Sequence, residues 1–141
     1  MKTILVGFDG SEPAVRAAQQ AVTLAKQTGA GIRLVCVIPP VWLPSADITG
    51  TLYTELLESQ QARGRALVDA QAATLRETGV AVETVLGQGA PADELARLSE
   101  APDVELIAVG NASHRGLARV FLGSVSYRLL HLAKKPVLVV H

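Results

Sequence analysis

Short runs of aliphatic residues alternate along the chain with longer stretches whose apolar residues recur at helical spacing. Four runs consist almost entirely of Val, Ile and Leu, which is typical of parallel strands that helices cover on both faces. A fifth run alternates apolar and polar side chains, which favours a more exposed strand at an edge of the sheet. In chain order the predicted strands span residues 3–6, 32–38, 80–86 (the alternating run), 105–109 and 136–140.

The stretches between these runs are predicted to be helices. The first begins after an N-cap at Ser11 and ends at Gly29. Small residues spaced at ~100° per residue give it a face that can lie close to a sheet. This face consists of Ala14, Ala18, Ala21 and Ala25.

Three more helices are predicted further along the chain. The second covers residues 51–78, although Gly64 inside it costs about 1 kcal/mol relative to Ala. The third covers residues 90–100, and the fourth begins near Ser124. The expected apolar sides are Leu52, Leu56, Leu67 and Ala70 in the second helix, and Val125, Leu129 and Leu132 in the fourth.

The strict alternation of strands and helices predicts one α/β domain over residues 1–141. We expect a doubly wound, five-stranded parallel sheet, because right-handed crossovers place helices on both of its faces. In such sheets ligands bind beyond the carboxyl ends of the strands, where the strand order reverses.

The composition argues against several classes of protein. Apolar residues make up 49% of the chain and aromatic residues only 4%, which fits an aliphatic core better than a base-stacking platform. Since 13 basic residues balance 13 acidic ones, nucleic acid is not an expected partner. No apolar run approaches the ~20 residues that span a bilayer, so no membrane contact is expected. With Cys36 as the only cysteine and no signal peptide visible, we expect a cytoplasmic protein.

Two glycine-bearing turns follow predicted strands and are candidate binding sites. The first spans residues 7–11, and the second runs from Gly110 to Gly123 and Ser124, at the start of the fourth helix. A helix start presents unpaired N–H groups and a partial positive charge, so it can hold an anion without a lysine. Three side chains between these points can add positive charge or simply be solvated: His114, Arg115 and Arg119.

The second turn resembles the loop of the ATP-binding universal stress proteins, which reads Gly-x-x-Gly, nine residues, then Gly-Ser or Gly-Thr. Gly110 matches the first glycine, residues 114–122 match the spacer, and Gly123 with Ser124 matches the end. Ser113 replaces the second glycine. The segments ILVGFDGSEPA, GAPADEL and LGSVSYRLLHLAKKPVLVV also resemble this family, so the resemblance covers essentially the whole chain.

The resemblance implies an adenine nucleotide alpha hydrolase-like fold with strand order 3-2-1-4-5, in a stress-response regulator that binds ATP. It implies that Asp9, beside Gly7, approaches the adenosine part of the nucleotide, and that Val37 contacts adenine. It also implies that Val109 and Gly110 lie beneath the ligand. The residues that match the start of the phosphate-binding helix are Gly123, Ser124, Val125 and Ser126.

Ser113 leaves the strength of nucleotide binding open. If this position needs a positive φ, a serine there costs about 1–2 kcal/mol, whereas its hydroxyl can also donate to a phosphate. ATP is the expected ligand, with Mg²⁺ at Asp9 if a metal takes part, and AMP, ADP and cyclic AMP are further candidates. The alternatives are a dimeric scaffold that acts through protein partners without nucleotide, and a slow ATPase with Asp9 near the phosphates.

The sequence contains no pattern typical of a fast enzyme. It has neither a GxxxxGK[ST] loop nor a GxGxxG fingerprint, and it lacks a GxSxG elbow and a cluster of His and Cys. We therefore expect a ligand-responsive regulator, with slow hydrolysis at most.

The last predicted strand points to self-association. If residues 137–140 form a sheet edge, their free backbone groups and apolar side chains would invite aggregation. Pairing with a second copy across a twofold axis removes this edge. The family resemblance implies the same homodimer, formed through Val137–Val140.

Overall fold

Strands and helices alternate along the chain, as predicted. The computed structural model describes residues 2–40, 50–111 and 123–141. The elements are β1 (Thr3–Gly7), α1 (Glu12–Thr28), β2 (Gly31–Ile38), α2 (Gly50–Arg76), β3 (Val82–Gln88), α3 (Pro91–Leu98), β4 (Val104–Gly110), α4 (Ser124–Leu132) and β5 (Val137–Val140).

The five strands form one parallel sheet in the order β3-β2-β1-β4-β5, which confirms the predicted topology. The order reverses at the central β1, because the chain first builds β2 and β3 on one side and then β4 and β5 on the other. The alternating run does form an edge strand, but it occupies Val82–Gln88 rather than residues 80–86. It extends beyond Leu86 because β2 is long enough to pair with Gly87 and Gln88.

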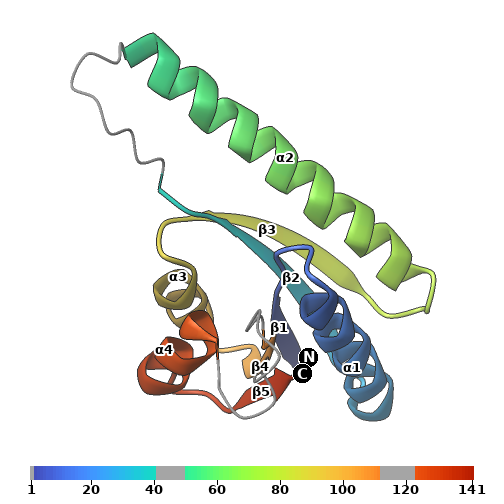
Figure 1. Ribbon diagram of the computed structural model, residues 1–141. Coiled ribbons are helices and arrows are strands. Elements are labelled where there is room, and N and C mark those ends of the chain that lie inside the picture. The colour runs from blue at the N-terminus through green and yellow to red at the C-terminus, as the bar shows by residue number, and fades with distance from the viewer. Residues whose placement is uncertain (1, 41–49, 112–122) are drawn as a thin grey trace.

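Two helices cover each face of the sheet (Figure 1). One core lies between the sheet and α1 with α2, and a second core lies between the sheet and α3 with α4. The predicted alanine face of α1 is buried throughout. Its predicted ends are also confirmed: the N–H of Ala14 donates to Oγ of Ser11 over 3.3 Å, and Gly29 closes the helix at φ 77°.

The predicted apolar face of α2 is largely wrong. Only the second half of this helix lies over β2 and β3, while its first half extends past the sheet (Figure 1). Leu52 and Leu56 therefore remain 42% and 36% exposed, and Ala70 is exposed as well. The residues that α2 buries are Gly64, Val68, Ala72 and Leu75.

Gly64 lets α2 approach the sheet closely. A Cβ at this position would lie 2.5 Å from Cδ1 of Ile38 and 3.0 Å from Cδ1 of Leu86. The helix-propensity cost of the glycine is thus offset by packing that a larger residue would disturb.

The predicted apolar side of α4 is wrong for its first and last residues. Leu129 is buried, but Val125 and Leu132 are each 38% exposed. The buried row instead consists of Ser126 and Leu129, three residues apart, because only this narrow side of the short helix faces the sheet. None of the helices over the described ranges is long and apolar enough to cross a lipid bilayer.

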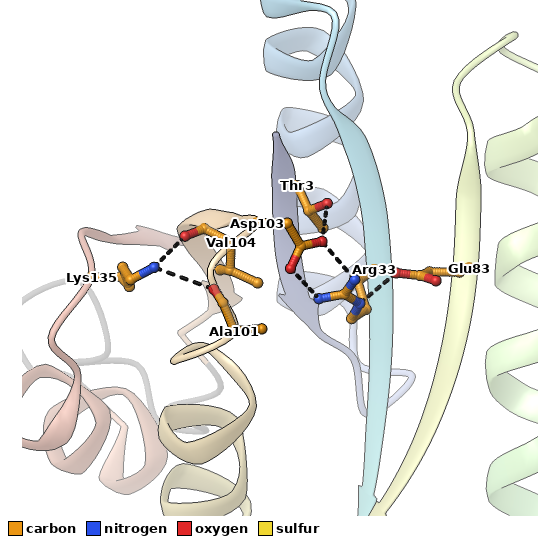
Figure 2. A network of polar contacts seen from close by, with 7 residues as sticks. All are labelled: Thr3, Arg33, Glu83, Ala101, Asp103, Val104 and Lys135. Carbon is orange, nitrogen blue, oxygen red and sulfur yellow. Dashed lines mark hydrogen bonds and ion pairs between the residues drawn. The ribbon is translucent and has the colours of Figure 1, made fainter. Parts of the chain in front are cut away.

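A polar network ties the strands together at the amino edge of the sheet (Figure 2). Arg33 on β2 binds both carboxylate oxygens of Asp103, which precedes β4, at 3.3 and 2.7 Å. Arg33 also binds Glu83 on β3, and the hydroxyl of Thr3 on β1 donates to Asp103 over 2.8 Å. Hydrogen bonds from Arg33 and then from Thr3 lower the pKa of Asp103 to about 2.

Replacing Asp103 with Asn is expected to lower the midpoint of thermal unfolding at neutral pH, because Arg33 loses a charged partner. The pKa of Asp103 is depressed from 3.8 to about 2, so its contribution is complete above the unfolded-state value and is lost as the pH falls through about 2. The difference between Asp103→Asn and the unaltered protein should therefore shrink over this interval, as followed by circular dichroism.

Glu105→Gln is a suitable control, since it removes only an exposed ion pair with Lys2. A destabilisation by Asp103→Asn that stayed constant down to the lowest pH would contradict the proposed role of the carboxylate.

Candidate functional site

A cavity of about 490 Å³ opens at the carboxyl ends of β1, β2 and β4, where the strand order reverses. This is the location that parallel α/β sheets favour for ligands. Its lining residues come from the β1–α1 turn, β2, α3, the end of β4 and the start of α4. They are Gly7, Phe8, Asp9, Ala14, Val35, Val37, Pro91, Leu95, Val109, Gly110, Gly123, Ser124, Val125 and Ser126.

The structure brings every predicted site residue except Ser113 to this cavity. Ser113 and the nearby His114, Arg115 and Arg119 lie outside the described residues. Sequence reasoning missed Phe8, Ala14, Val35, Pro91 and Leu95. Two signals could have found the last three: Val35 shares a strand face with Val37, and Leu95 follows Pro91 by one helical turn.

One wall of the cavity is aliphatic. It combines Val35 and Val37 of β2, Leu95 of α3 and Val109 of β4. Gly7 allows this arrangement, because a Cβ at this position would lie 2.8 Å from Cδ1 of Leu95. The end of β1 therefore leaves room for α3 to close over the strands. An apolar slot of this kind suits a flat, weakly polar ring.

The backbone of β2 adds a polar edge to this wall. β1 reaches only Gly7, the register partner of Val35, whereas β2 continues to Ile38. The N–H of Phe8 donates to the carbonyl oxygen of Val35 over 2.8 Å, so the peptide groups of odd-numbered residues here point toward β1. By the same alternation the N–H and C=O of Val37 point past the end of β1 at the cavity.

Asp9 holds the β1–α1 turn. Its Oδ1 accepts the N–H of Ser11 over 2.9 Å, next to Gly10 at φ 83°. Burial and then the charge of Asp9 raise the pKa of the Cys36 thiol, which is buried. No group of three or more His, Cys, Asp and Glu side chains suited to a metal ion occurs in the part of the chain that the structure describes.

The start of α4 is open toward the cavity. Its N-cap, Gly123, has an extended backbone and supplies no side chain to bind the N–H groups of the first turn. Ser124 adds an exposed hydroxyl at the same place. Because these N–H groups carry the positive end of the helix dipole, this corner of the cavity attracts an anion.

Two sets of contacts position this helix. The hydroxyl of Ser126 donates to the carbonyl oxygen of Gly110 over 3.3 Å, which joins α4 to the end of β4. Arg128 binds both carboxylate oxygens of Asp93 at 2.7 and 3.1 Å, which joins α4 to α3. This pairing, first through the hydrogen bond from Arg128, lowers the pKa of Asp93.

Gly110 serves close packing rather than a special turn. Its φ is not positive, so the backbone conformation at this position does not itself require a glycine. A Cβ on Gly110 would instead lie 2.3 Å from the carbonyl carbon of Pro13 and 2.5 Å from the nitrogen of Ala14. The glycine therefore lets the first turn of α1 rest directly on the end of β4.

Comparison with known proteins agrees with this geometry. The model of the universal stress protein family matches residues 1–141, the whole chain. This chain belongs to the universal stress protein family. A universal stress protein of Methanocaldococcus jannaschii, MJ0531, is 34% identical to it over 142 residues, which cover 99% of this chain and 81% of that protein.

Solved structures show the same fold, an adenine nucleotide alpha hydrolase-like arrangement. UspA from Lactobacillus plantarum superposes with a TM-score of 0.85 at 22% identity, covering 99% of this universal stress protein and 97% of that chain. A universal stress protein in complex with cAMP gives 0.73 at 25% identity, covering 99% and 97%. One from Archaeoglobus fulgidus in complex with dAMP gives 0.64 at 20% identity, covering 100% and 98%.

Gly110→Ala is expected to destabilise this universal stress protein by about 1–3 kcal/mol, because the methyl group meets backbone atoms that cannot rotate away. Urea unfolding measures the loss. Gly50→Ala is the matched control, since a Cβ there has no neighbour within 4 Å and Ala favours the helix. Equal stability of the two variants would show that the close contact at Gly110 does not contribute to the free energy of unfolding.

Proposed function

We propose that this universal stress protein binds an adenine nucleotide, with ATP the expected ligand, and regulates a stress response as a homodimer. The observation that carries this proposal is a single cavity with two different ends. One end is the start of α4, whose N-cap supplies no side chain, and the other is an apolar slot beside the N–H and C=O of Val37. The solved relatives in complex with cAMP and dAMP support the choice of an adenine nucleotide.

The phosphates would lie at the start of α4. Gly123, Ser124 and Val125 line the cavity there, and the backbone N–H groups of the first turn point toward it. A phosphate at this position needs no basic residue, because the N–H groups, the helix dipole and the hydroxyl of Ser124 stabilise its charge. Ser113, on the neighbouring loop, is a further predicted contact.

The base would lie in the slot between β2 and α3. Adenine presents an acceptor nitrogen next to an amino group, which complements the neighbouring N–H and C=O of Val37. The aliphatic side chains of Val37, Leu95 and Val109 would cover the ring, above the turn that Asp9 holds. The cavity volume of about 490 Å³ lies within the range typical of small-molecule sites.

The proposed role is regulation rather than rapid catalysis. The one carboxylate predicted near the phosphates, Asp9, accepts the N–H of Ser11 and so maintains the turn. Cys36 is free and buried, which fits the proposed cytoplasmic location, where thiols stay reduced.

Ser124→Asp is expected to reduce the affinity for ATP at least about a hundredfold, because a fixed negative charge would occupy the place of a phosphate. The same charge favours the start of a helix, so the variant should remain folded. Isothermal titration calorimetry with ATP, and separately with AMP and cyclic AMP, measures the effect.

Thr51→Asp is the control, since it adds the same charge to the first turn of α2, away from the cavity. Undiminished binding by Ser124→Asp would exclude the start of α4 as the phosphate site. If the unaltered protein bound none of these nucleotides at millimolar concentration, the scaffold alternative would replace the proposal.

The homodimer would form through β5. This strand lies at an edge of the sheet, and its side chains remain partly exposed. The N–H groups of Ile107 and Asn111 donate to the carbonyl oxygens of Pro136 and Val140, so the even-numbered residues of β5 face β4. Val137 and Val139 therefore direct their peptide groups outward, where a second copy could pair with them.

Val139→Pro is expected to abolish the dimer without unfolding the protomer, because proline removes an N–H that points away from β4. Light scattering after gel filtration measures the mass, and circular dichroism checks the fold. The control is Tyr127→Ala, which removes an exposed side chain of α4 and leaves the strand intact. A Val139→Pro protein that remained dimeric would place the interface elsewhere.

A further inference from the structure

Asn111 connects the end of β4 to two other parts of the fold. It follows β4 directly and is only 5% exposed. Its Oδ1 accepts the N–H of Gly123, the N-cap of α4, over 2.6 Å. Its Nδ2 lies 3.2 Å from Nδ1 of His141, and its own N–H donates to the carbonyl oxygen of Val140 over 2.7 Å. A single buried amide thus bridges the helix start and the residue after β5.

The hydrogen bonds fix the orientation of this amide. The backbone N–H of Gly123 can only donate, so the oxygen of Asn111 must face it and the NH₂ group must face His141. Since an amide NH₂ can only donate, Nδ1 of His141 must accept. A hydrogen bond between these two nitrogens therefore requires the neutral imidazole with its proton on Nε2. A protonated ring would set two donors against each other.

Among the described residues, few charged side chains lie near His141. From α1, Nε of Arg16 donates to the carbonyl oxygen of His141 over 2.8 Å, and Arg16 pairs with Glu12 at 3.8 Å. Both side chains are substantially exposed. Gly110 and Asn111 at the end of β4, and Gly123 and Ser124 at the start of α4, contribute no formal charge. In the part of the chain that the structure describes, the side chain of Asn111 contacts the ring of His141.

We propose that Asn111 is a positioning residue for the anion site, and that neutral His141 keeps its amide in the working orientation. The inference rests on the proposed function and deepens it. Gly123 has no side-chain cap to fix the N–H groups behind it, so the bond to Asn111 sets where they point. Protonation of His141 would place two donors opposite each other and displace the amide, and nucleotide binding would then weaken.

The first test needs no nucleotide. Amide ¹H–¹⁵N spectra of the full chain are recorded from about pH 8 to about pH 5.5, the range in which histidine changes charge. The resonance of Gly123 should shift together with the ring signals of His141. In His141→Gln, whose amide oxygen accepts at every pH, this shift should disappear. If the chemical shift of the Gly123 amide did not change together with the ring signals of His141, the inference would be overturned, whatever the protein binds.

The second test measures the affinity for cyclic AMP over the same range, because a phosphodiester keeps a constant charge there, unlike the terminal phosphate of ATP. The affinity of the unaltered protein should fall about three- to tenfold toward low pH, and that of His141→Gln should stay level. Asn111→Ala should bind about tenfold more weakly at high pH. His131→Gln, which changes an exposed histidine near the end of α4 outside the cavity lining, is the control and should retain the pH dependence of the unaltered protein.

Asn111→Asp separates positioning from a general loss of stability. Its carboxylate can accept from both Gly123 and a protonated His141, so its affinity for cyclic AMP should be lower overall but should rise toward low pH. A fall with pH like that of the unaltered protein would contradict the assigned orientation. If the unaltered protein bound neither cyclic AMP nor ATP at any pH, the proposed function would fail, while the Gly123 spectra would still decide the Asn111–His141 contact.

Discussion

The site depends on a close approach of two backbones at Gly110. The first turn of α1 rests on the end of β4 at distances that exclude even a methyl group. α1 begins directly after the β1–α1 turn, so this contact fixes the end of β4 relative to that turn. Residues of both line the cavity. Its geometry is therefore set by main-chain packing, before any side chain that lines it is considered.

The two edges of the sheet differ in how their polar groups are satisfied. At the amino edge, Arg33 and Asp103 satisfy each other and join three strands to the segment before β4 (Figure 2). At the carboxyl edge, the N-cap of α4 supplies no side-chain cap, and the end of β2 has no neighbouring strand on the β1 side. Polar groups left open beside a firmly bonded scaffold are typical of a binding site.

The sequence predicted most of the architecture, because hydrophobic periodicity reports directly on burial. The five strands, their edge member and the alanine face of α1 all follow from local patterns. The apolar side of α2 could not be predicted in this way, since periodicity does not tell where the underlying sheet stops. The packing role of Gly64 was hidden for the same reason: it depends on Ile38 and Leu86, which are distant in sequence.

The candidate site shows the same limit. Motif spacing located the residues at the strand ends, whereas Leu95 joins the cavity through the packing of α3 on the sheet. Asn111 escaped notice because its importance lies in a bond across 12 positions and another across 30. Such contacts between distant residues are properties of the tertiary structure and leave no local pattern in the sequence.

The unequal lengths of β1 and β2 have a consequence for how ligand preference is encoded. The groups that β2 offers past the end of β1 belong to the peptide chain, so every amino acid except proline would supply both of them at Val37. Exchanging side chains there would alter the fit of a ring but not the order of donor and acceptor. The preference for one ring system over another therefore depends on the lengths and register of the two strands. An insertion or deletion in β1 or β2 would change this preference more readily than a substitution.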